Sequence, residues 1–108
     1  MVENHTLYAD LVAEVRIPEN GILSRTMYSD DHVKVVLFGF APGQELSAHT
    51  APMSASLYFL RGEAQLTLGD EIREVKQGCY VHMAPGLQHG ILARKPVVLL
   101  LTMYKQAR

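Results

Sequence analysis

Short runs of apolar residues, each ended by a turn signal, cover most of the chain. The segment 63–68 (EAQLTL) alternates polar and apolar side chains, which is the pattern of a half-buried strand. A second segment, 32–40 (HVKVVLFGF), is dense in β-branched and aromatic residues. Together these criteria predict strands at residues 32–40, 55–60, 63–68, 71–76, 79–83, 89–94 and 97–104. Turn signals at such short intervals indicate an all-β sandwich or barrel with antiparallel meander connections.

The apolar residues among the first 20 positions follow neither a helical nor a strand period. Leu7, Leu11 and Val15 fall at helical spacing, but other apolar residues blur that pattern. We therefore expect an edge strand or an irregular arm over residues 1–20. The whole chain, residues 1–108, is predicted to be one domain, because 108 residues are too few to build two separate cores.

Composition excludes several classes of protein. Ten basic and eleven acidic residues leave a net charge of −1, so we expect no nucleic-acid partner. The longest apolar run, residues 97–101, is far shorter than the roughly 20 residues of a membrane-spanning helix, so no membrane association is expected. The N-terminus lacks the pattern of an export signal, and the single cysteine, Cys79, fits a reducing compartment. These features predict a cytoplasmic protein.

Two segments combine glycine and histidine at fixed spacing and resemble the two conserved motifs of the cupin superfamily. The matching residues are Gly43, His49 and Gly62 in the first motif, and Gly78, Gly86 and His89 in the second. The resemblance implies a small cupin, in which a double-stranded β-helix forms a jelly-roll-like barrel over about residues 32–104.

The metal-binding part of the resemblance is degenerate. In cupins with the full motif, three histidines and one glutamate hold one Mn, Fe, Ni, Zn or Cu ion. Here the resemblance retains His49 and His89, whereas Ala51 and Ala55 stand at the positions of the other histidine and the glutamate. His82 is a candidate third ligand if its side chain faces inward; since side chains alternate along a strand, only one of His82 and Met83 can do so. Two expectations therefore stay open for the site: that it binds one divalent transition metal ion, and that it binds no metal.

An internal pocket around the two histidines would be mostly apolar, as small-molecule sites usually are. The same side chains would equally serve as barrel core. The candidate lining residues are Ala51, Met53, Ala55, Leu57, Tyr58, Phe59 and Met83.

Three functional interpretations stay open. The first is a pocket around His49 and His89 that binds a divalent metal, a small organic ligand or both, and the second is a metal-dependent enzyme of dioxygenase, isomerase or decarboxylase type. The third is a metal-free module with a sensing or structural role. We expect a homodimer in each case, because the resemblance implies it: many small cupins pair through their sheets. The segment 97–103 (VVLLLTM) is also more apolar than an edge strand should be, so it is either buried in the barrel or helps to form a dimer.

Overall fold

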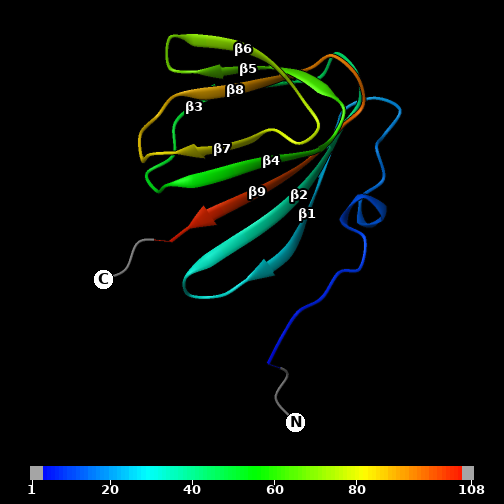
Figure 1. Ribbon diagram of the computed structural model, residues 1–108, viewed down its shortest axis with the longest axis vertical. Coiled ribbons are helices and arrows are strands. Elements are labelled where there is room, and N and C mark those ends of the chain that lie inside the picture. The colour runs from blue at the N-terminus through cyan, green and yellow to red at the C-terminus, as the bar shows by residue number, and fades with distance from the viewer. Residues whose placement is uncertain (1–3, 106–108) are drawn as a thin grey trace.

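Within residues 4–105, which the computed structural model describes, nine strands form two antiparallel sheets that face each other (Figure 1). Sheet A has the strand order β1 (Ile22–Ser29), β2 (Val33–Phe40), β9 (Val97–Tyr104), β4 (Ala55–Arg61) and β7 (Tyr80–Met83). Sheet B has the order β3 (Glu45–His49), β8 (His89–Ala93), β5 (Glu63–Leu68) and β6 (Glu71–Lys76). The all-β double-stranded β-helix is confirmed.

All seven predicted strands are present, with bounds that differ by at most one residue at either end. Two further strands, β1 and β3, were not predicted, because most of their residues are exposed. The apolar residues of β1 (ILSRTMYS) do not alternate with polar ones, and β3 (ELSAH) has only five residues. The expected meander is wrong. Only the β1–β2 and β5–β6 pairs are hairpins between consecutive strands, whereas the other connections lead from one sheet to the other.

The main core lies between the sheets. It is built from every second residue of the strands, whose side chains point inward. Phe40, Phe59 and Leu66 are almost completely buried there. β9 is the central strand of sheet A, between β2 and β4, and its first three residues are buried. This position accounts for the apolar segment 97–103 without a partner chain.

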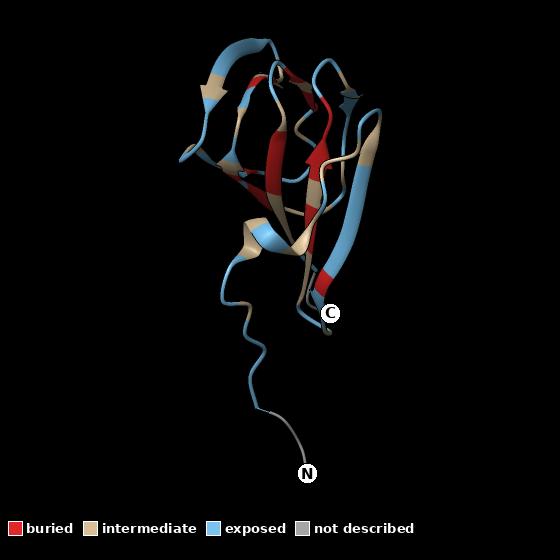
Figure 2. Cartoon of the chain, turned by 90° about the vertical axis from the view of Figure 1, so that its right-hand side faces the viewer, coloured by how far each residue is buried: buried red, intermediate tan, exposed pale blue. Residues whose placement is uncertain are grey.

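A second, smaller core covers the outer face of sheet A. Its buried members are Met27, Leu37 and Val98, and apolar residues of the N-terminal segment pack against them. That segment contains a short 3-10 helix, η1 (Leu11–Glu14), and no strand within residues 4–21. Figure 2 shows the helix against the sheet and the preceding residues extending away from it. Residues 1–3 of the expected arm lie outside the described part of the chain.

The two ends of the barrel differ. At one end, on the left of Figure 1, the β3–β4 loop, the β5–β6 turn and the β7–β8 loop come together, and we call this the loop end. Backbone hydrogen bonds tie these loops to one another, from Gly86 N to Ala51 O (2.8 Å) and from Gly69 N to Gln88 O (2.7 Å). At the other end Gly62 has a φ of +97°, and a Cβ added there would lie 2.1 Å from Pro96 O, so only glycine fits.

Among the described residues, no helix is long and apolar enough to cross a membrane.

Candidate functional site

A β-bulge brings His49 and His89 to the same face of sheet B. β3 and β8 pair through Leu46 and Ile91, and then through His49 and His89. Between these two pairs β3 has one more residue than β8. In a regular strand His49 would point to the face opposite Leu46, because side chains alternate. The extra residue reverses that alternation and turns His49 toward the interior, directly opposite His89.

Gly90 makes room for this bulge. A Cβ at Gly90 would lie 3.0 Å from Ala48 N and 3.2 Å from Ala48 Cα. These are backbone atoms, which cannot rotate away as the end of a side chain can. The glycine in β8 therefore allows the bulged backbone of β3 to approach closely.

The two imidazole rings are 4.3 Å apart between centroids and are tilted by 55°. His89 is only 7% exposed, whereas His49 is exposed at the loop end. Each ring is held by the backbone two residues earlier: His49 Nδ1 lies 2.9 Å from Ser47 O, and His89 Nδ1 lies 3.0 Å from Leu87 O. Because a carbonyl oxygen can only accept, each Nδ1 carries a proton in this arrangement, so in the neutral tautomer Nε2 is the nitrogen that offers a lone pair.

His82 does not join this pair. It lies on β7 beside the buried Met83, and strand alternation turns Met83 into the core and His82 outward. Its ring is exposed and lies 6.2 Å from that of Tyr104. Within residues 4–105, no group of three or more His, Cys, Asp or Glu side chains is placed to hold a metal ion.

The candidate lining residues divide into three groups. Ala55, Leu57, Phe59 and Met83 are buried members of the main core. Ala51 and Met53 are half-buried in the β3–β4 loop. Tyr58 was expected at the pocket but points outward and is 40% exposed, because Leu57 and Phe59 take the inward positions of β4.

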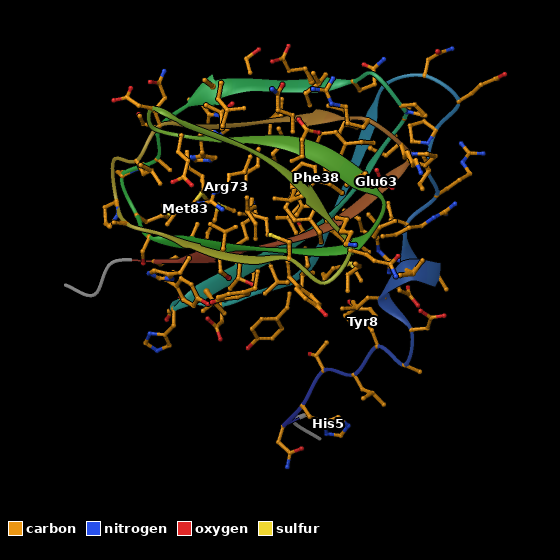
Figure 3. The ribbon with its side chains drawn as sticks, turned by 45° about the horizontal axis from the view of Figure 1, so that its top comes forward. His5, Tyr8, Phe38, Glu63, Arg73 and Met83 are labelled. Carbon is orange, nitrogen blue, oxygen red and sulfur yellow. The ribbon has the colours of Figure 1, made fainter. Side chains whose placement is uncertain are left out.

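Two charged residues that the sequence pattern did not single out, Glu71 and Arg73, lie on the inward face of sheet B at the same end, where both side chains are exposed at the edge of the sheet. In sheet B, Leu68 pairs with His89 on one side and with Glu71 on the other, so the three side chains share one face. Arg73 pairs with the buried Leu66 and faces the same way. Figure 3 shows Arg73 and Met83 at this end of the barrel. The alternation in EIREVK would have placed Glu71 and Arg73 on the face of the apolar Val75.

Comparison with known proteins supports the architecture. Residues 36–103 match the family described as "Cupin domain". A conserved protein of unknown function from Streptococcus pyogenes is similar in structure, with a TM-score of 0.86 at 29% identity over 98% of this chain and 93% of that one. A cupin superfamily protein from Desulfitobacterium hafniense gives a TM-score of 0.85 at 22% identity, over 98% and 95% of the two chains. None of the curated proteins matches the chain.

Proposed function

Because the chain belongs to the cupin domain family, we propose that His49 and His89 together bind one divalent transition metal ion at the loop end and place a small organic ligand beside it. The observation that carries this proposal is the matched pair of rings, 4.3 Å apart, each with Nδ1 against a backbone carbonyl. Hydrogen bonds of this kind fix the tautomer and the direction of metal-binding histidines.

The donor set fits a weakly held and accessible ion. Two imidazole nitrogens suit Zn, Ni, Cu and Fe, and the half-buried Ala51 and buried Ala55 offer no further donor. A bound ion would supply Lewis acidity to a ligand on its open positions. The protein itself holds both rings in place, keeps the core behind them apolar, and leaves the His49 side open to solvent.

Metal titration of untagged, chelator-treated protein tests the proposal. Zn²⁺ and Ni²⁺ should each bind at one ion per chain by calorimetry. His49→Ala and His89→Ala should each weaken binding by at least about tenfold, since loss of even a residue that only hydrogen-bonds to a metal ligand costs that much. His82→Ala is the matched control, because it removes an exposed imidazole near the same end, and it should leave the affinity unchanged. Binding well below one ion per chain, or an equal loss in the control, would contradict the proposal.

A metal-free ligand-binding module is the second candidate, and the alanines at positions 51 and 55 favour it. This candidate predicts a protein indifferent to chelator that a small ligand still stabilises. Ala51→Phe, which puts a bulky side chain into the loop that follows His49, should then abolish that stabilisation. A homodimer and a cytoplasmic location belong to the proposal in either case; Cys79, the single cysteine, fits the location because the chain has no second thiol for an internal disulfide.

A further inference from the structure

We propose that Arg73 recognises the carboxylate group of the ligand, so that the loop end of the barrel takes a small organic acid. This inference rests on the proposed function in one respect, namely that a ligand lies beside His49 and His89. It goes beyond that function because it names the chemical class of the ligand and the residue that selects it.

The strand pairing determines on which face of sheet B the Arg73 side chain lies. β6 is the edge strand of sheet B, and it pairs only with β5. Its residue Val75 pairs with the fully buried Ala64 and packs against the main core, so Val75 faces inward. Arg73 is two residues away and shares that face, whereas Ile72 lies on the opposite face and is 62% exposed.

Arg73 lies on the same face of sheet B as the histidine pair, one row of residues away from it. One row across sheet B runs from His49 through His89 and Leu68 to Glu71, and the next row runs from Leu46 through Ile91 and Leu66 to Arg73. Arg73 therefore lies on the edge strand of sheet B opposite the one that carries His49, on the same face and one row further from the loop end. A ligand beside the two imidazoles would lie on the face that these residues share.

The guanidinium group is available to a ligand. Arg73 Nε contacts Glu71 Oε2, and the two side chains are 68% and 51% exposed. That contact uses Nε and leaves the two terminal nitrogens, each with two N–H donors, to face a carboxylate in the forked geometry that arginine favours. An exposed ion pair of this kind is weak, so an incoming anion can compete with Glu71.

The local charges favour a monoanion. Lys34 also faces inward, because it pairs with Met103, which in turn pairs with the buried Ala55. Within the strands, the inward charges at this end are thus two cations and one carboxylate. In the metal-free protein one carboxylate group on the ligand balances them, and the partly buried Leu68 and Met103, which pack against the main core, suit the carbon skeleton of such an acid.

Butyrate and its neutral isostere butyramide are the probes for this site. Titrations are followed by ¹H–¹⁵N chemical shifts, both in chelator-treated and in zinc-loaded protein. Butyrate should shift the amides of His49, His89 and Leu68 and should bind at least about tenfold more tightly than butyramide, because a charge-assisted bidentate contact is replaced by a neutral one. Arg73→Gln should reduce butyrate binding by about tenfold and leave butyramide unchanged.

Two further variants sharpen the test. Glu71→Gln removes the internal competitor and should strengthen butyrate binding. Arg94→Gln is the control, because Arg94 pairs with Glu74 (3.2 Å) and both are exposed, so butyrate binding should not change. Zinc affinity should be the same in Arg73→Gln as in the unmodified protein.

Several results would overturn the inference. These are butyrate that does not bind, butyrate and butyramide that bind equally, or a folded Arg73→Gln variant that binds butyrate normally. If Arg73→Gln only makes the protein self-associate, then the inward charges protect an edge strand and serve no ligand. Failure to bind zinc, with Arg73-dependent butyrate binding intact in chelator-treated protein, would instead contradict the metal site alone.

Discussion

Asp30 holds the turn between β1 and β2 with three hydrogen bonds. Its Oδ2 accepts from the Tyr28 hydroxyl (2.7 Å), and its Oδ1 accepts from the backbone N–H groups of His32 (2.7 Å) and Val33 (2.9 Å). The Tyr28 hydroxyl, followed by the two backbone donors, lowers the pKa of Asp30 from 3.8 to about 2. The charged form of Asp30 is therefore favoured in the folded protein.

This shift predicts an acid-dependent contribution to stability. A carboxyl group whose pKa is lower in the folded state stabilises the fold above its unfolded pKa of 3.8, and the contribution is lost as pH falls toward about 2. Asp30→Ala should therefore lower the melting temperature by a constant amount above about pH 5, and the gap should shrink between about pH 4 and about pH 2. Thermal melts across this range measure it. Asp31→Ala, which removes an exposed carboxylate from the same turn, is the control. A gap that does not change with pH would refute the assignment.

The sequence predicts single residues where a family motif identifies them. It does not predict on which face of a strand a side chain lies. The motif spacing identified His49 and His89, and the structure places them opposite each other. Whether His82 faced inward depended on the register of β7, which spacing does not fix. Arg73 was missed because a charged residue in a strand is ordinarily assigned to the solvent side.

At the level of elements, the bulge in β3 has the largest effect on the site. Without it, Ala48 rather than His49 would share the inward face with Leu46. The sequence ELSAH gives no sign of the bulge, because a bulge arises from the pairing with another strand. The seven predicted strands, in contrast, carry their own apolar pattern and could be recognised without knowledge of their neighbours.

Gly90→Ala should displace the bulge. The new Cβ would press on the backbone of Ala48, which should lower the free energy of unfolding by about 1–3 kcal/mol, the usual cost of overpacking. The displacement turns His49 away from His89, so zinc affinity should fall as well. Both effects are measured on the same samples, by denaturant unfolding and by calorimetry.

Gly39→Ala separates the two effects. Gly39 is also buried in a strand without positive φ, and its added Cβ would lie 3.1 Å from Arg16 O, remote from the histidines. It should destabilise the protein to a similar extent and leave zinc affinity intact. If both variants retain zinc binding, the bulge does not orient His49.

For the molecule as a whole, we expect a second copy of the chain to bind on the outer face of sheet A. Tyr58 and Tyr80 pair across β4 and β7 and are 40% and 60% exposed. A groove of about 800 Å³ lies nearby between the N-terminal segment and the sheet, with Leu7 and Leu100 in its lining. Exposed aromatic side chains beside a groove lined by both apolar and polar residues are typical of an interface.

The homodimer is therefore expected to form through this face. Sedimentation at micromolar concentration should give the mass of two chains. Changing Tyr58 and Tyr80 together to glutamate should produce monomers, because each dimer would then bury four uncompensated charges. Ile72→Glu is the control, since Ile72 is an exposed apolar residue (62%) on sheet B and its change should leave the dimer intact. A monomeric unmodified protein would refute the expectation.

The whole-molecule architecture could be predicted because the glycine and histidine spacing resembles a known family. The strand order could not be predicted from periodicity, which describes each strand alone and led to the wrong meander. The second core was missed for the same reason: the helical spacing of Leu7, Leu11 and Val15 said nothing about the sheet that Leu11 and Val15 cover.

The central place of β9 sets the order in which the barrel can be completed. β9 is the last strand within residues 4–105, yet it supplies the hydrogen bonds that join the β1–β2 hairpin to the β4–β7 pair. A nascent chain leaving the ribosome therefore carries two unfinished halves of sheet A, each with an open edge, until residues 97–104 emerge. Closure depends on contacts between distant parts of the sequence, which form slowly. A chain that stops short of residue 97 would expose both edges to pairing with other chains.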